Sequence, residues 1–260
     1  MLGHGKSSII NTCVQIVHQA DFKNVAGSGK SNYPITMDRT DYDLTSHVVI
    51  NDNRGVNKMS PEEQEEVAAQ MGQMRGQSTV EWDRSVRGKL NLIYQQFNYR
   101  PIEITVPVFV YSVESLLTDE RYEEIEPFIR EAHKITGIYP IIVLTKVGTH
   151  RDMADECYDK FKALGANHVF QVENYTVEQH EHHPKTQAEV LKFLDTCLKE
   201  VDESIARRAT EDPQKKYMDL AMDAVHNIIQ KENEKKEIKI QIIKEKCEKS
   251  KEEIRRQKNV

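Results

Sequence analysis

The chain has 260 residues, of which 38% are hydrophobic and 30% charged, and its formal net charge is −6. This length allows one large domain or one domain with an appendage, and the composition is typical of a globular protein. No run of 18 apolar residues occurs and the first residues lack a signal-peptide core, which argues against a membrane span and against secretion. The cysteines at positions 13, 157, 197 and 247 form no C-x-x-C pair, so we expect reduced thiols and a cytoplasmic location.

The charge is unevenly distributed along the chain. Residues 213–260 carry 13 Lys and Arg against 9 Asp and Glu, whereas the other residues carry 23 against 33. Nucleic-acid-binding domains usually concentrate positive charge on a folded face. An acidic body with a mildly basic tail therefore disfavours nucleic acid as a partner.

Four apolar, β-branched segments predict strands, over residues 46–50, 105–112, 141–145 and, more weakly, 168–172. Continuous apolar runs of this kind are typical of parallel strands that are buried on both faces of a sheet. Apolar residues at helical spacing follow the later strands, over residues 120–134, 153–164 and 186–207. The alternation of strands and helices predicts an α/β fold with a parallel sheet.

Two stretches depart from this alternation. Residues 56–104 are polar, and their pattern favours helices near 62–74 and 90–97. From Pro213 onward the pattern favours one or two long helices without a sustained heptad. We therefore expect a domain over residues 1–208 and a C-terminal helical extension over 209–260. We expect the extension to contact a protein partner, with self-association or a coiled coil as alternatives.

An apolar helical stretch near the start opens with the second half of a P-loop pattern, which consists of Gly3, His4, Gly5, Lys6, Ser7 and Ser8. In such a loop, backbone N–H groups and a helix N-terminus hold phosphate, the lysine reaches the outer phosphates and the serine hydroxyl binds Mg²⁺. The glycines keep side chains away from the phosphates. A second Gly-Lys-Ser triplet, at residues 29–31, has no strand before it, so we discount it.

Two further motifs follow predicted strands in the order found in P-loop NTPases. Asp52 and Gly55 form D-x-x-G after the strand 46–50, where an aspartate holds Mg²⁺ through water and a backbone N–H senses the γ-phosphate. A simple β-turn is the alternative. Thr145 and Lys146 end the strand 141–145, but Gly148 stands where GTPases carry a guanine-reading aspartate. We therefore expect only a shallow preference for guanine over adenine.

Together these motifs resemble the interferon-induced protein 44 family and, more broadly, dynamin- and Ras-type GTPases. The resemblance covers residues 3–206 and rests mainly on G-K-S-S and D-x-R-G, with T-D-Y-D-L, L-T-K and V-E-N-Y in support. It implies a Ras-like P-loop sheet, GTP or GDP bound with Mg²⁺, and cytoplasmic roles linked to immunity. The strand that leads into the P-loop of that fold would precede Met1, so the implied sheet lacks its first strand.

The resemblance also assigns residues to the nucleotide. Gly5, Lys6, Ser7 and Ser8 are assigned to the phosphates, Asp52 and Gly55 to Mg²⁺ and the γ-phosphate, and Thr145 and Lys146 to the base. Gly3, His4 and Asn174 of V-E-N-Y are assigned to the nucleotide without a more specific role. Thr36 is our choice for the threonine that ligates Mg²⁺ beside Ser7 and Asp52, and Thr40 is its competitor.

Hydrolysis requires a group that positions water, which in Ras-like enzymes is a glutamine directly after D-x-x-G. Here that residue is Val56, and Arg54 is a candidate charge stabiliser. We therefore expect a guanine-nucleotide switch that hydrolyses GTP to GDP slowly or with a partner's help. The alternative is a degenerate GTPase that serves as an interaction scaffold without nucleotide.

Overall fold

The structure is a computed structural model, and it describes residues 3–27, 40–53, 71, 104–148, 150–208 and 213–258. The described residues fall into two units, of which the second begins at residue 214. Several predicted features lie outside the described residues: Thr36, Arg54, Gly55, Val56, the triplet at 29–31, the helix near 90–97, and all of the helix near 62–74 except residue 71.

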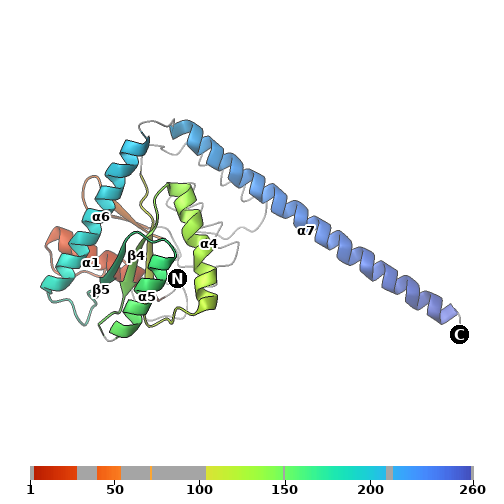
Figure 1. The fold of residues 1–260 in the computed structure, drawn as a ribbon, viewed down its shortest axis with the longest axis horizontal. Helices are drawn as coiled ribbons and strands as arrows, with labels where there is room; N and C mark the ends of the chain where they lie inside the picture. Colours follow the sequence, from red (N-terminus) through yellow and green to blue (C-terminus); the bar gives the residue numbers. More distant parts are fainter. Residues whose placement is uncertain are drawn as a thin grey trace. The chain divides into compact units, whose positions relative to one another are not determined.

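The centre of the first unit is a three-stranded parallel sheet of β3 (Val108–Ser112), β4 (Ile141–Thr145) and β5 (Val169–Val172), in that order. Each strand is followed by a helix: α4 (Asp119–Thr136), α5 (Arg151–Ala163) and α6 (Pro184–Arg208), respectively (Figure 1). Ser112 pairs with Thr145, and Thr145 with Val172, so the three strands end level. The predicted α/β class is confirmed, and with it the parallel arrangement of these strands.

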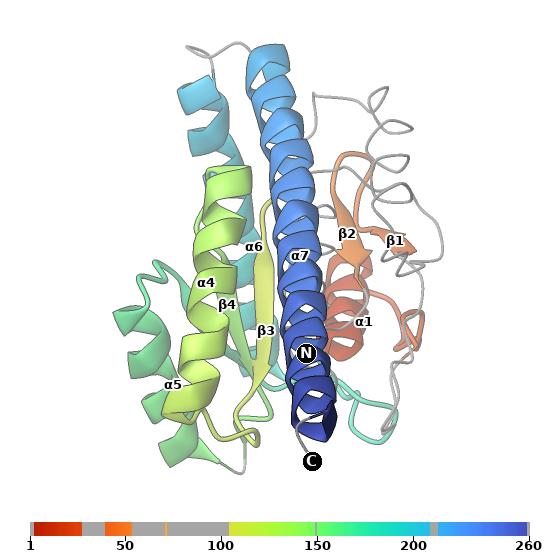
Figure 2. The ribbon, with the colours of Figure 1, turned by 90° about the vertical axis from the view of Figure 1, so that its right-hand side faces the viewer.

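Successive side chains along a strand point to opposite faces of the sheet, and here both sets are apolar. Helices therefore cover both faces. Phe109, Tyr111, Ile142 and Leu144 pack on one face with residues of α4 and α5. Val110, Val143, Phe170 and Val172 pack on the other face with residues of α6 and of α1 (Lys6–His18). Figure 2 shows α4 and α5 on one side of β3 and β4, and α1 on the other. The core is therefore a sheet between two helical layers.

A separate antiparallel pair contains β1 (Thr40–Asp43) and β2 (Val49–Asp52), with Thr40 opposite Asp52. The expectation that segment 46–50 belongs to a parallel sheet is therefore wrong. The connection is too short for a parallel crossover, because the N–H groups of Leu44 and Thr45 both donate to the carbonyl of Val48 in a tight turn. Buried Leu44 packs with residues of α1, which holds this hairpin against the helix.

The second unit contains α7 (Pro213–Lys258), a single helix of 46 residues that starts at a proline, as helices commonly do. Its length is about 70 Å at the standard rise per residue. Among its described side chains, six large apolar ones are exposed: Met222, Ile229, Ile238, Ile240, Ile242 and Ile243. In the part of the chain that the structure describes, no helix combines the length and the apolar character needed to cross a membrane.

Candidate functional site

The predicted motif residues meet where the three parallel strands end. β3, β4 and β5 end at Ser112, Thr145 and Val172, and the loop of residues 3–5 that leads into α1 touches all three strand ends or the residues just beyond them. Ligands of open α/β sheets bind outside the carboxyl ends of the strands. This edge is therefore the candidate site.

The backbone of this loop depends on its two glycines. Gly3 and Gly5 have φ angles of 70° and 84°, a region that side chains disfavour. Gly5 is the N-cap of α1 and has no side chain with which to cap the helix, and no acidic residue lies in its first turn. The first N–H groups of a helix lack intrahelical partners and its N-terminus is positive, so this end suits an anion.

Gly5 is also closely surrounded. A Cβ added there would lie 3.2 Å from both Asn174 Nδ2 and Thr145 Oγ1. We expect Gly5→Ala to lower the free energy of unfolding by about 1–3 kcal/mol through backbone strain alone, plus a further loss from these contacts. Denaturant unfolding measures the sum.

Gly165→Ala is the matched control, because Gly165 has a φ of 91° and its nearest atom to an added Cβ lies 3.9 Å away. It reports the strain without the crowding. Equal losses in the two variants would show that the packing around Gly5 contributes nothing.

Ser7 and Asp52 come together across 45 residues of sequence. The Ser7 hydroxyl donates to Asp52 Oδ2 at 2.9 Å, and Asp52 is only 2% exposed. Lys6 adjoins the same carboxylate: burial lowers the pKa of Lys6, and the negative charge of Asp52 partly offsets that effect. A lysine, a hydroxyl and a buried carboxylate thus gather at the start of α1.

His4 is one of the predicted nucleotide-binding residues, but its side chain is buried and turned toward β3. Its Nδ1 accepts a hydrogen bond from the backbone N–H of Ser112 at 2.9 Å, and its ring lies 4.9 Å from that of Tyr111. Burial, with a smaller contribution from nearby positive charges that include Lys6, lowers its pKa from 6.5 to about 3. The imidazole is therefore neutral and fixes the loop to the end of β3.

Two predicted residues hold the loop from the other strands. Thr145 is fully buried, and its hydroxyl donates to the carbonyl of His4 at 2.8 Å. Asn174, which follows β5, donates from Nδ2 to the carbonyl of Gly5 at 3.4 Å. In this structure both side chains support the loop, whereas the sequence assigned Thr145 to the base.

A polar group of side chains lies farther along the same edge. Lys146 has a φ of 59°, unusual for a residue with a side chain, and its Nζ lies 2.6 Å from Glu114 Oε2. The backbone N–H of Gly148 donates to Glu173 Oε2 at 2.6 Å. No sequence motif indicated Glu114, and the only signal for Glu173 was its place in V-E-N-Y.

The structure thus brings together Gly3, His4, Gly5, Lys6, Ser7, Asp52, Thr145 and Asn174, with Ser8 in the first turn of α1 and Lys146 after β4. Thr36 and Gly55 lie outside the described residues, so their assignments stay predictions. Thr40, the competitor of Thr36, is the first residue of β1 and pairs with Asp52.

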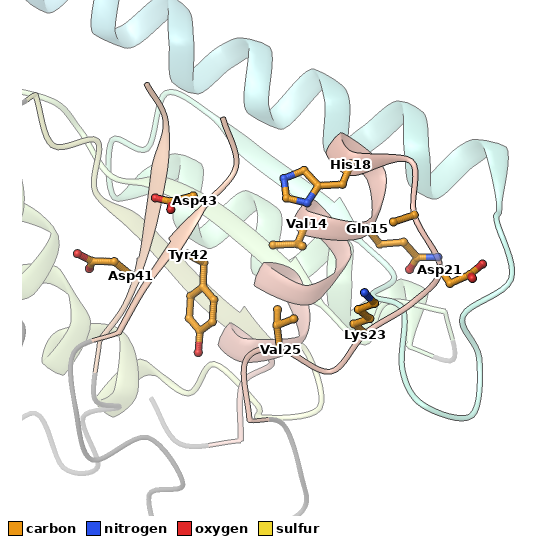
Figure 3. Close-up of a pocket in the computed structure, with 10 residues that line it drawn as sticks. Val14, Gln15, His18, Asp21, Lys23, Val25, Asp41, Tyr42 and Asp43 are labelled. Atoms are coloured by element: carbon orange, nitrogen blue, oxygen red, sulfur yellow. The ribbon is translucent and has the colours of Figure 1, made fainter. Parts of the chain in front are cut away.

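A pocket of about 370 Å³ lies elsewhere, between α1 and β1 (Figure 3). Three groups of residues line it: Val14, Gln15 and His18 of α1; Ala20, Asp21, Lys23 and Val25 after that helix; and Asp41, Tyr42 and Asp43 of β1. None of these residues belongs to the loop at the strand ends. The pocket is therefore separate from the candidate site.

The donor atoms at the candidate site suit one kind of metal ion. Mg²⁺ prefers oxygen and usually takes only one or two protein ligands, with water and phosphate completing its shell. The Ser7 hydroxyl and the Asp52 carboxylate supply such oxygens 2.9 Å apart. Among the described residues, no group of three or more His, Cys, Asp or Glu side chains is arranged to hold a metal by itself. A magnesium ion here would therefore depend on a phosphate ligand.

Comparisons with protein-family models, with curated proteins and with solved structures found no match to this chain.

Proposed function

We propose that the chain binds a guanine nucleotide with Mg²⁺ at the loop before α1, in a Ras-like P-loop domain. The observation that carries this proposal is the hydrogen bond from Ser7 to buried Asp52 beside Lys6. The two motifs were recognised separately, 45 residues apart, and a P-loop nucleotide site requires their side chains to meet at one point.

Each residue then has a defined task. The N–H groups at the start of α1 hold the phosphate oxygens. Lys6 contributes a positive charge, and a phosphate together with Asp52 balances this buried charge better than Asp52 does alone. Ser7 and Asp52 hold Mg²⁺, Asp52 through water. The ion, when bound, neutralises charge on the phosphates. Gly5 keeps the backbone close to them.

Hydrolysis is the slow part of the proposed function. Val56 stands where a water-positioning glutamine occurs in Ras-like enzymes, and a valine side chain cannot orient water. The proposal is therefore a switch that hydrolyses GTP to GDP slowly or with a group from a partner. The exposed apolar residues of α7 favour a protein partner on that helix, or self-association through it.

The magnesium dependence of binding tests the Ser7–Asp52 pair. We expect the parent chain to bind GTP roughly tenfold more weakly in EDTA than with Mg²⁺, a difference of about 1.4 kcal/mol. Asp52→Asn can still accept the Ser7 hydroxyl but lacks the charge that attracts the ion, so its affinity should change little when Mg²⁺ is removed. A fluorescent GTP analogue reports both affinities.

Asp43→Asn is the matched control, because Asp43 is an exposed carboxylate on β1, the strand paired with β2. It should keep the parent's magnesium dependence. If Asp52→Asn responds to Mg²⁺ as the parent does, the metal assignment fails. If the parent binds no nucleotide at all, the scaffold alternative replaces the proposed function.

A further inference from the structure

Position 148 lacks a side chain, yet a carboxylate occupies the space beside it. Glu173 Oε2 accepts the backbone N–H of Gly148 at 2.6 Å, and a Cβ built on Gly148 would lie 2.9 Å from the same oxygen. Glu173 is exposed and directly follows the last residue of β5. An ionised carboxylate has about four lone-pair sites, so Oε2 can accept the Gly148 N–H while the group still accepts further donors.

The position of Glu173 relative to the phosphate site is fixed by its neighbours. The next residue, Asn174, donates to the carbonyl of Gly5, and Thr145, three residues before Gly148, donates to the carbonyl of His4. Glu173 and Gly148 are thus each a few residues from a direct contact with the loop of residues 3–5. A nucleotide whose phosphates lie at the start of α1 would extend its base along this edge.

Guanine and adenine differ in what they present to such a group. Guanine places two adjacent donors, N1–H and the N2 amino group, on one edge, and a carboxylate accepts both at once. Adenine places an acceptor, N1, beside its N6 amino group. A carboxylate meeting that edge leaves one oxygen against an acceptor. Sites built from such hydrogen bonds discriminate strongly, because the wrong partner leaves polar groups unpaired.

We propose that Glu173 is the carboxylate that reads guanine in this chain, delivered from the end of β5 to the place beside Gly148. This inference rests on the proposed function. It replaces the expectation of a shallow guanine preference with that of a clear one. It also explains why position 148 is glycine: an aspartate there would bring a second carboxylate against Glu173.

The test compares fluorescent GTP and ATP analogues on the full chain, its Glu173→Gln variant and a control. Glutamine keeps the length of the side chain and its oxygen can still accept the Gly148 N–H, but its amide nitrogen only donates and therefore faces one of the two guanine donors unpaired. We expect Glu173→Gln to lose about tenfold or more in GTP affinity and to keep its ATP affinity within twofold. Glu181→Gln, which removes an exposed carboxylate of the same loop, should leave both affinities unchanged.

A gain of binding provides a second readout. Xanthosine triphosphate carries a carbonyl where guanine has its N2 amino group, so a glutamine amide complements it by donating to that carbonyl and accepting N1–H. Glu173→Gln should therefore bind it more tightly than the parent does. Gly148→Asp should bind GTP more weakly than the parent.

The outcomes separate the two proposals. Tight, Lys6-dependent GTP binding by the parent, with Glu173→Gln losing GTP and ATP equally or losing neither, would overturn the assignment of Glu173 and leave the proposed function in place. A parent chain that binds neither nucleotide would overturn both.

Discussion

Lys6→Ala is expected to lower affinity for Mg²⁺-GTP by tenfold or more while the chain remains folded. A charge-assisted contact to phosphate contributes about 1.5–3 kcal/mol, and alanine removes it. In the unbound chain, burial lowers the pKa of Lys6 and the charge of nearby Asp52 offsets this only in part. A bound phosphate would add negative charge beside Lys6 and so stabilise its charged form. Titration with a fluorescent GTP analogue measures the loss, and circular dichroism checks the fold.

Lys192→Ala is the matched control, because Lys192 is an exposed lysine on α6 that is not among the residues assigned to the nucleotide. Its affinity should equal that of the parent. Unchanged GTP binding in Lys6→Ala, with a circular dichroism spectrum like the parent's, would remove the P-loop assignment.

The second large effect is the loss of stability in acid caused by His4. Its pKa is about 3 in the folded chain, against an ordinary value of 6.5, so between these values only the unfolded chain takes up a proton there. The stability contributed by neutral His4 is complete above pH 6.5 and is lost as the pH falls toward 3. Between these pKa values, His4 lowers the free energy of unfolding by about 1.4 kcal/mol for each pH unit of acidification. The free energy of unfolding therefore falls by about 2–3 kcal/mol between pH 6.5 and pH 4.5.

Denaturant unfolding between pH 7.5 and 4.5 tests this. His4→Asn retains an acceptor for the Ser112 N–H but does not titrate, so its stability should be lower at pH 7.5 and less dependent on pH than that of the parent. His47→Asn, which removes an exposed histidine, should show the same change of the free energy of unfolding with pH as the parent. Identical slopes in His4→Asn and the parent would show that His4 is not buried in its neutral form.

The parallel sheet could be predicted because its signal is local. The segment Ile141–Thr145 is buried at every position, and its observed bounds are those predicted. The prediction for the strand before it was less accurate, since β3 begins at Val108 rather than at residue 105. Pro107 has no N–H to donate, although its carbonyl accepts the N–H of Ile141. A hydrophobic pattern alone does not locate such an end.

The hairpin was predicted less well because its signals are polar. The segment 46–50 looked like one strand, but Thr45 Oγ1 accepts the N–H groups of His47 and Val48, which makes this part a turn. The strand β2 therefore begins at Val49, and Asp52 is its last residue. Its partner β1 has the sequence TDYD, which no apolar pattern identifies as a strand. Pairing with β2 determines it.

The candidate site was predictable in its motifs and unpredictable in its supporting contacts. Motif order identified Lys6, Ser7 and Asp52. The sequence did not show that His4 would turn into the core, because a histidine between two glycines has no local reason to be buried. Nor did it show that Glu173 would reach Gly148, since that contact depends on how the loops after β4 and β5 run beside each other.

Every other part of the proposed function depends on the binding of Mg²⁺-GTP at the loop before α1. Isothermal titration of the unaltered chain with GTP, once with Mg²⁺ and once in EDTA, tests it most directly. We expect one nucleotide per chain, with roughly tenfold weaker binding once Mg²⁺ is removed. No heat of binding from GTP, GDP or ATP under either condition, from a chain shown to be folded by circular dichroism, would contradict it.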